Sequence, residues 1–196
     1  MTSIYGTFLT GEDVEQAVRA TIATWVDAYV AEAERQKGVT IPPIRHYDLA
    51  APQDPGQMPA IVVRCSSLLA EPERYGDGTY DATWGVGVGV VVAHETRDGS
   101  RALCQVLTAA VRALLVQQGG LGGFAEATEW LDEEVTEIAW TTDRSIHGGS
   151  IQVAVHVRAV ADASGGPTVP PSPDPTAPVS YVAVSSTHIT SNRSVP

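Results

Sequence analysis

The chain has 196 residues, 43% of them hydrophobic, which is enough for one domain with a buried core and an appendage. Its formal net charge is −11, and because phosphate binding needs a basic surface, a chain this acidic should repel DNA overall. No apolar run approaches the roughly 20 residues of a membrane helix. The N-terminus lacks the basic start and apolar centre of a signal peptide, so we expect a cytosolic product that meets no membrane.

A long amphipathic helix is predicted over residues 10–38. Thr10 and Asp13 fit a capping box at its start, and Gly38 is a typical C-terminal stop. Apolar residues recur every three or four positions, which predicts one buried stripe made of Val14, Val18, Ile22, Trp25, Tyr29 and Ala33. We therefore expect Trp25 and Tyr29 to lie in the core and not in a ligand cage.

Prolines then punctuate residues 39–59, which predicts a loop with at most a short extended piece near residues 45–49. Residues 60–66 follow as a strand, since Ile61, Val63 and Cys65 alternate with Val62 and Arg64.

Residues 80–93 (YDATWGVGVGVVVA) are the most informative segment. Large apolar side chains at most even positions, with Gly85, Gly87 and Gly89 at odd positions, predict a strand with one face of bare backbone. Glycine weakens a strand, so three at alternate positions indicate that something approaches that face closely. Two alternatives are open: a helix of the same chain lies on the glycines, or a neighbouring subunit does.

A second helix is predicted to open at Asp98 and to end at Gly119. Its apolar stripe is wide and its exposed charges are few, so it should be the more buried of the two helices. Residues 119–124 (GGLGGF) are predicted to be a flexible connection. Two further strands, near residues 134–142 and 150–160, should form a hairpin with a long tip at residues 143–149.

These elements predict an α+β fold with two layers. A mainly antiparallel four-stranded sheet is formed by residues near 60–66, 79–95, 134–142 and 150–160, and both helices cover one of its faces. Residues 1–162 constitute this core domain.

Composition changes after Asp162, and residues 163–196 are predicted to be a proline-rich linker and an extended C-terminal arm. Residues 165–178 hold six prolines and no apolar period, which favours polyproline conformation. Residues 179–184 have the β-propensity to add to a foreign sheet edge, and the candidate interaction residues are Val179, Tyr181, Val182 and Val184. The alternative is a disordered tail.

No motif indicates catalysis, a cofactor or a metal. The glycines at 85, 87 and 89 lie inside a strand and not at a strand-to-helix turn, residues 119–124 lack the Gly-Lys-Ser/Thr of a phosphate loop, and no G-x-S-x-G occurs. The five histidines and two cysteines show no metal-ligand spacing, and Cys65 and Cys104 are predicted to be small buried hydrophobes. We therefore expect a protein that is not an enzyme.

Acidic residues cluster at Glu126, Glu129, Asp132, Glu133, Glu134 and Glu137. A solvated negative surface is the simplest interpretation. Acid–base work or Mg²⁺ binding is the alternative, and it requires convergence in a pocket.

As a whole, the order of elements resembles the tail terminator proteins of long-tailed bacteriophages. The likeness spans about residues 1–162 and lies in the helix at 10–38, the strand-helix unit at 80–118 and the hairpin TEIAWTTDRSIHGGSIQVAVHVRA. The resemblance implies a structural ring in the virion, usually of six subunits, that caps the tail tube and joins it to the head–neck connector. DNA would pass through its lumen without tight binding.

The implied partners are further copies of the chain, the major tail tube protein and the neck proteins. We expect acidic side chains to outnumber basic ones in the lumen, with the acidic run as the candidate lining. Another neck protein, such as a stopper or head-completion protein, is the nearest alternative. A small α+β ligand-binding domain or enzyme is the distant one, and it would need a deep pocket with convergent polar groups.

Overall fold

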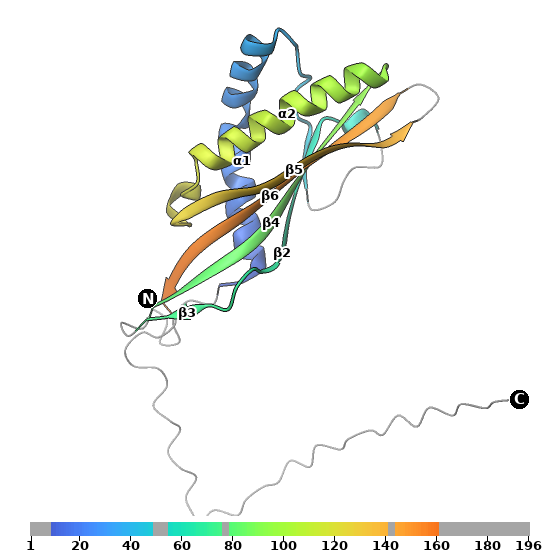
Figure 1. Ribbon diagram of the computed structural model, residues 1–196. Coiled ribbons are helices and arrows are strands. Elements are labelled where there is room, and N and C mark those ends of the chain that lie inside the picture. The colour runs from blue at the N-terminus through green and yellow to red at the C-terminus, as the bar shows by residue number, and fades with distance from the viewer. Residues whose placement is uncertain (1–8, 49–54, 76–78, 141–143, 161–196) are drawn as a thin grey trace, which may run out of the picture. The chain divides into compact units, whose positions relative to one another are not determined.

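The computed structural model describes residues 9–48, 55–75, 79–140 and 144–160 (Figure 1). It confirms the predicted α+β class: two helices pack on one face of a mainly antiparallel sheet. The predicted arm, with Val179, Tyr181, Val182 and Val184, lies outside the described residues.

Helix α1 (Gly11–Lys37) begins and ends as predicted. The Thr10 hydroxyl accepts a hydrogen bond from the Asp13 N–H at 3.3 Å, and the Asp13 carboxylate accepts one from the Thr10 N–H at 2.8 Å, which completes the capping box. Gly38 adopts the left-handed conformation at φ 66° and donates its N–H to the Glu34 carbonyl.

The buried stripe of α1 differs from the prediction at one aromatic residue. Val14, Val18 and Ile22 are fully buried, but the stripe continues through Val26, and Trp25 is 46% exposed. Placing Trp25 in the core was therefore wrong: position 26, four residues after Ile22, keeps the inward direction that position 25 leaves. Tyr29 is half-buried and donates its hydroxyl to Gln117 Oε1 at 2.9 Å.

Helix α2 (Arg97–Gln117) is the more buried helix, as predicted. Its N-cap is Thr96, two residues before the predicted opening, and the Thr96 hydroxyl accepts the Gly99 N–H at 3.2 Å. By length and composition alone α2 could cross a membrane. Its apolar stripe instead packs on the sheet and on α1, and this accounts for that composition.

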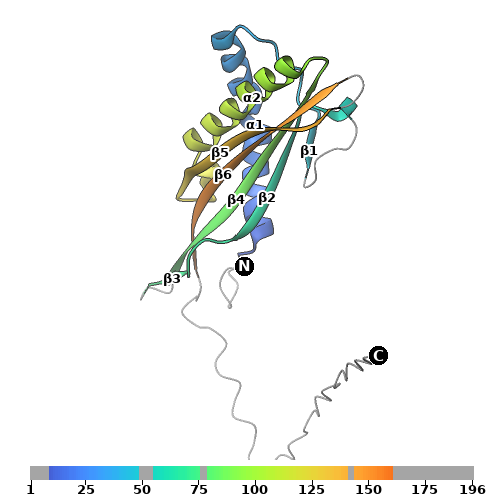
Figure 2. The same ribbon diagram turned by 45° about the vertical axis from the view of Figure 1, so that its right-hand side comes forward.

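The sheet has six strands in the order β1-β2-β4-β6-β5, with β3 paired to β4 off this path (Figures 1 and 2). All pairs are antiparallel except β1 with β2. The strands are β1 (His46–Asp48), β2 (Ala60–Leu68), β3 (Glu73–Arg74), β4 (Thr79–His94), β5 (Ala127–Trp140) and β6 (Ser145–Val160), and two 3-10 turns span Pro55–Gln57 and Leu121–Gly123. The four predicted strands are β2, β4, β5 and β6, and β1 is the short extended piece expected near residues 45–49.

The predicted long hairpin tip was wrong. Residues 145–149 belong to β6, where Gly148 and Gly149 lie opposite Val91 and Val90 of β4. This part of β6 is buried on both faces, since Thr108 of α2 lies over Gly149 and Ile138 lies over Gly148, so buried and exposed positions do not alternate there. Strand β5 begins seven residues before its predicted start. The bulge at Leu131 shifts the phase of the side chains, so the first half of the strand shows no continuous period of two.

The core lies between the helices and the valine side of β4. Val86, Val88, Val90 and Val92 are fully buried there, and Ile151, Val153 and Val155 of β6 extend the same surface. Gly85, Gly87 and Gly89 alternate with these valines and therefore point away from the helices. The alternative in which a helix of the same chain lies on these glycines is wrong.

A helix does lie on a different glycine. Gly149 pairs with Val90 and so faces α2, and a β-carbon added there would collide with the Thr108 hydroxyl and lie 3.1 Å from Thr108 Cβ. The close helix-to-sheet approach that the glycine strand suggested is thus provided by Gly149 in β6.

Candidate interaction surface

The sheet face opposite the helices, here called the open face, brings together two groups of residues that are far apart in sequence. Directly paired residues of neighbouring strands share a face. Gly87 pairs with Gln152, which pairs with Asp132. The neighbouring rows join Gly89 through Ser150 to Glu134, and Gly85 through Ala154 to Glu129. The glycines and three of the acidic residues therefore form one surface.

The glycines of this surface are approached by side chains of their own domain. A β-carbon on Gly85 would lie 2.8 Å from Leu69 Cδ2, and one on Gly87 would lie 3.2 Å from Gln152 Nε2. At Gly89 the nearest atom would be Val62 Cβ at 3.7 Å, an ordinary contact. The open face is thus thinly covered near Gly85 and Gly87 and bare at Gly89.

A shallow hollow of about 180 Å³ lies in the open face beside Gly89. Its lining includes Gly148, and the Ile138 side chain, 55% exposed, lies over that glycine. Glu134 and Ser150 also line the hollow. A cavity this small, with one carboxylate, suits an apolar contact from another surface better than a bound substrate.

The acidic run divides into two sets. Glu129, Asp132 and Glu134 are exposed on the open face. The other three pair with arginines: Glu133 with Arg112 at 2.9 Å, Glu137 with Arg97 at 2.7 Å, and Glu126 with Arg158 at 3.4 Å. Within the described part of the chain, no three histidine, cysteine or acidic side chains gather as a metal site.

Ion pairs also hold the end of the sheet where β3 lies. Arg158 donates to Asp81 at 2.9 Å, and the Tyr75 hydroxyl donates to Asp81 at 2.8 Å. The hydrogen bond from Arg158 is the main cause that lowers the pKa of Asp81, and the hydrogen bond to Asp81 raises the pKa of Tyr75. These contacts fasten β3 to β4 and β6, and they satisfy one another.

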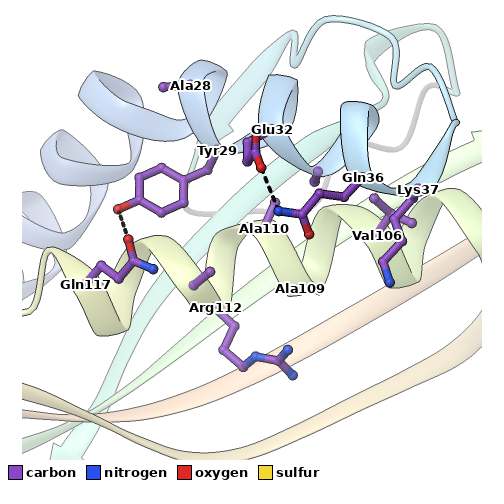
Figure 3. Close-up of a pocket in the computed structure, with 12 residues that line it drawn as sticks. Ala28, Tyr29, Glu32, Gln36, Lys37, Val106, Ala109, Ala110, Arg112 and Gln117 are labelled. Atoms are coloured by element: carbon purple, nitrogen blue, oxygen red, sulfur yellow. Dashed lines mark hydrogen bonds between the residues drawn. The ribbon is translucent and has the colours of Figure 1, made fainter.

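A larger groove of about 570 Å³ lies between α1 and α2 (Figure 3). Small residues line much of it: Ala28, Ala33, Ala109, Ala110 and Ala113. Glu32 accepts a hydrogen bond from Gln36, and the hydrogen bond from Arg35 lowers the pKa of Glu32 to about 2. The groove lining includes no serine, cysteine or histidine, and its polar members are Tyr29, Glu32, Gln36, Lys37, Arg112 and Gln117.

Sequence reasoning named the glycines and the acidic residues but did not place them on one face. It missed Gln152, Ile138 and Arg64, which also belong to this surface. The signal for Gln152 and Arg64 was present, because each is a polar position in an otherwise apolar alternating strand.

No family model and no curated protein matches the chain. Among solved structures, one similar chain comes from a structure titled "Virion of native gene transfer agent (GTA) particle". The TM-score is 0.44 and the identity 15%, over 73% of this chain and 96% of that chain. A likeness at this level identifies neither a family nor a function.

Proposed function

We propose that the chain is a structural virion protein, a tail terminator that forms a ring, caps the tail tube and joins it to the head–neck connector. The open face carries this proposal, because among the described residues no helix lies over this face of the sheet. Large apolar side chains are also exposed at the sheet edges, as expected of a subunit that assembles. The kind of assembly comes from the resemblance of the element order to tail terminators.

In the proposed ring the open face borders the lumen. Glu129, Asp132 and Glu134 are exposed there, against Arg64 and Arg158, and Arg158 is already paired with Asp81 and Glu126. This surface is negative and offers few contacts to phosphate. Each phosphate that a basic side chain neutralised would add a salt-dependent grip, so a negative lining lets DNA slide.

The C-terminal arm is proposed to tie the joint together. At about 3.1 Å per residue, the fourteen residues 165–178 in polyproline form span roughly 40 Å, more than the radius of a domain of this size. Val179, Tyr181, Val182 and Val184 could then add as a strand to a sheet edge of an adjacent subunit or a neighbouring tail or neck protein.

Mass measurement and electron microscopy of the purified protein, with and without uncapped tail tubes, test the proposal. Rings on tube ends are the expected result, with or without rings in free solution, since assembly can require the tube. A particle reconstruction in which this protein is absent from the end of the tail tube would contradict the proposal. Rings that bind only the connector side would identify a stopper or head-completion protein instead.

The lumen assignment has a separate test in DNA binding. The wild-type protein should bind duplex DNA weakly at every salt concentration, whereas a Glu129→Lys/Glu134→Lys variant should gain salt-sensitive binding. Tight, salt-sensitive binding by the wild-type protein would refute the negative lumen.

A further inference from the structure

The exposed large apolar residues are concentrated at two opposite edges of the sheet. Of the eight such residues in the described part of the chain, six lie at these edges and are 41% to 55% exposed. Trp130, Leu131 and Ile138 belong to β5, and with the exposed acids of that strand they define the β5 edge. Leu68 ends β2, and Leu69 and Tyr75 flank β3; with Arg64 they define the β2–β3 edge.

The two edges offer one pair of opposite charges, Arg64 against the acids of β5, although Glu71 and Glu73 are also exposed at the β2–β3 edge. The β5 edge exposes Glu129, Asp132 and Glu134. The β2–β3 edge exposes Arg64, which has no acidic partner among the described residues. Pairing the β5 edge of one copy with the β2–β3 edge of another would neutralise Arg64. Two β5 edges brought together would repel each other, and two β2–β3 edges would leave Arg64 without an acid of β5.

The charged residues of the two edges also lie at the same level along the strands. Arg64, Gly87, Gln152 and Asp132 form one row across four strands, so Arg64 and Asp132 lie on the same face at opposite ends of that row. In a neighbour placed head to tail at the same height, Arg64 comes beside Asp132 of the next copy. Strands β2 and β5 run in opposite directions, so this placement also continues the antiparallel order of the sheet.

The backbone of both edges limits how they can meet. Strand β1 covers β2 only at Ala60–Val62, which leaves residues 63–68 without a second strand among the described residues. The Cys65 N–H is already taken by the Glu15 carboxylate at 2.7 Å, and bulges interrupt β5 at Leu131 and Ile138. The occupied Cys65 N–H and the bulges of β5 oppose a continuous ladder of backbone hydrogen bonds between two copies. A contact between these edges would therefore be made by side chains.

We propose that the β5 edge of one copy docks on the β2–β3 edge of a second copy. Trp130 and Leu131 pack against Leu68, Leu69 and Tyr75, and Arg64 of one copy faces Asp132 of the other. The two surfaces differ, so the contact is heterologous and repeats until a ring closes. This inference rests on the proposed function and names the surfaces that build its ring.

Sedimentation of the full-length protein over a concentration series up to about 1 mM, where even a weak contact of about 4 kcal/mol is populated, tests the inference. The wild-type protein should associate. Leu131→Ser should weaken association at least tenfold, while Val116→Ser, a similarly exposed apolar position on α2, should not. Arg64→Glu and Asp132→Arg should each weaken it about tenfold, while Lys37→Glu, exposed at the end of α1, should not.

Mixing supplies the decisive comparison. The Arg64→Glu and Asp132→Arg proteins should each associate about tenfold more weakly than the wild-type protein, and mixing them should restore association. In the mixture one kind of contact keeps the native pair, and the other holds the reversed pair. Absence of rescue on mixing, or a wild-type protein that stays monomeric throughout the series, overturns the inference. A monomer that still caps tube ends would overturn the inference and leave the proposed function standing. Oligomers that depend on these edges but bind no tail or neck component would support the inference and contradict the proposed function.

Discussion

Gly149 and Gly89 lie on opposite faces of the sheet, and this predicts opposite responses to the same substitution. Gly149→Ala must displace Thr108 of α2, so it should lower the free energy of unfolding by about 1–3 kcal/mol. Gly89→Ala adds a methyl group in ordinary contact with Val62 and removes the entropic cost of a strand glycine, so it should be neutral or stabilising by up to about 1 kcal/mol. Urea unfolding of both variants measures the difference. Equal losses would show that the two faces are equally covered.

The Cys104 thiol predicts how stability falls in alkali. Burial raises the pKa of Cys104 from 9.0 to about 11. Below pH 9 the thiol is neutral in both the folded and the unfolded chain, and its contribution to stability is complete. Between pH 9 and 11 only the unfolded thiol ionises, so the free energy of unfolding falls as the pH rises.

A Cys104→Ala variant tests this sign. Its free energy of unfolding should fall less than that of the wild-type protein between pH 9 and 11, since every other titrating group is shared. Parallel curves for the two proteins would show that Cys104 ionises equally in both states.

At the scale of elements, Arg112 fastens the edge strand β5 to α2. It donates to Glu133 at 2.9 Å, and its guanidinium lies 5.2 Å from the centre of the Trp130 ring. Arg112→Ala should destabilise the attachment of β5 by about 1 kcal/mol and speed amide hydrogen exchange in β5. Arg101→Ala removes an exposed arginine of the same helix that has no ion pair among the described residues, and it should leave the exchange unchanged.

The sequence predicted those elements whose patterns are local. The capping box at Thr10, the stop at Gly38 and the alternation of β2 and β4 each depend on neighbours within a few positions. The start of β5 was missed because the bulge at Leu131 breaks the period of two in its first half. The glycines of β6 were assigned to a loop, although they lie in the strand, where Thr108 and Ile138 cover its two faces.

The open face could be predicted only in part, for a related reason. A period of two shows that Gly85, Gly87 and Gly89 share a face, but it does not show which face the helices cover. The meeting of Gly87 with Asp132 depends on the strand order, which places β6 between β4 and β5. Strand order is a property of long-range pairing, and local patterns do not encode it.

For the whole molecule, truncation after Asp162 separates folding from assembly. The six strands and two helices end by Val160, so the truncated protein should unfold at the same urea concentration as the full chain. Ring formation on tube ends should weaken, because the proposed arm contact is lost. Truncation after Pro178 keeps the linker and removes the candidate strand, so it should weaken assembly equally. Unchanged ring formation and infectivity in both truncated proteins would leave the arm without this role.

The pairing of β4 with β6 over sixteen residues has a consequence for how the chain reaches its native state. The partners in this ladder lie 51 to 81 positions apart in sequence, with α2 and β5 between them. The loop-closure entropy of such distant pairs makes folding slow compared with a helical domain of equal size. During synthesis, one edge of the valine-rich β4 stays unpaired until β6 leaves the ribosome. We therefore expect aggregation in that interval to limit the yield more than the stability of the finished domain does. Slower synthesis at low temperature should therefore raise the soluble yield without changing the unfolding midpoint.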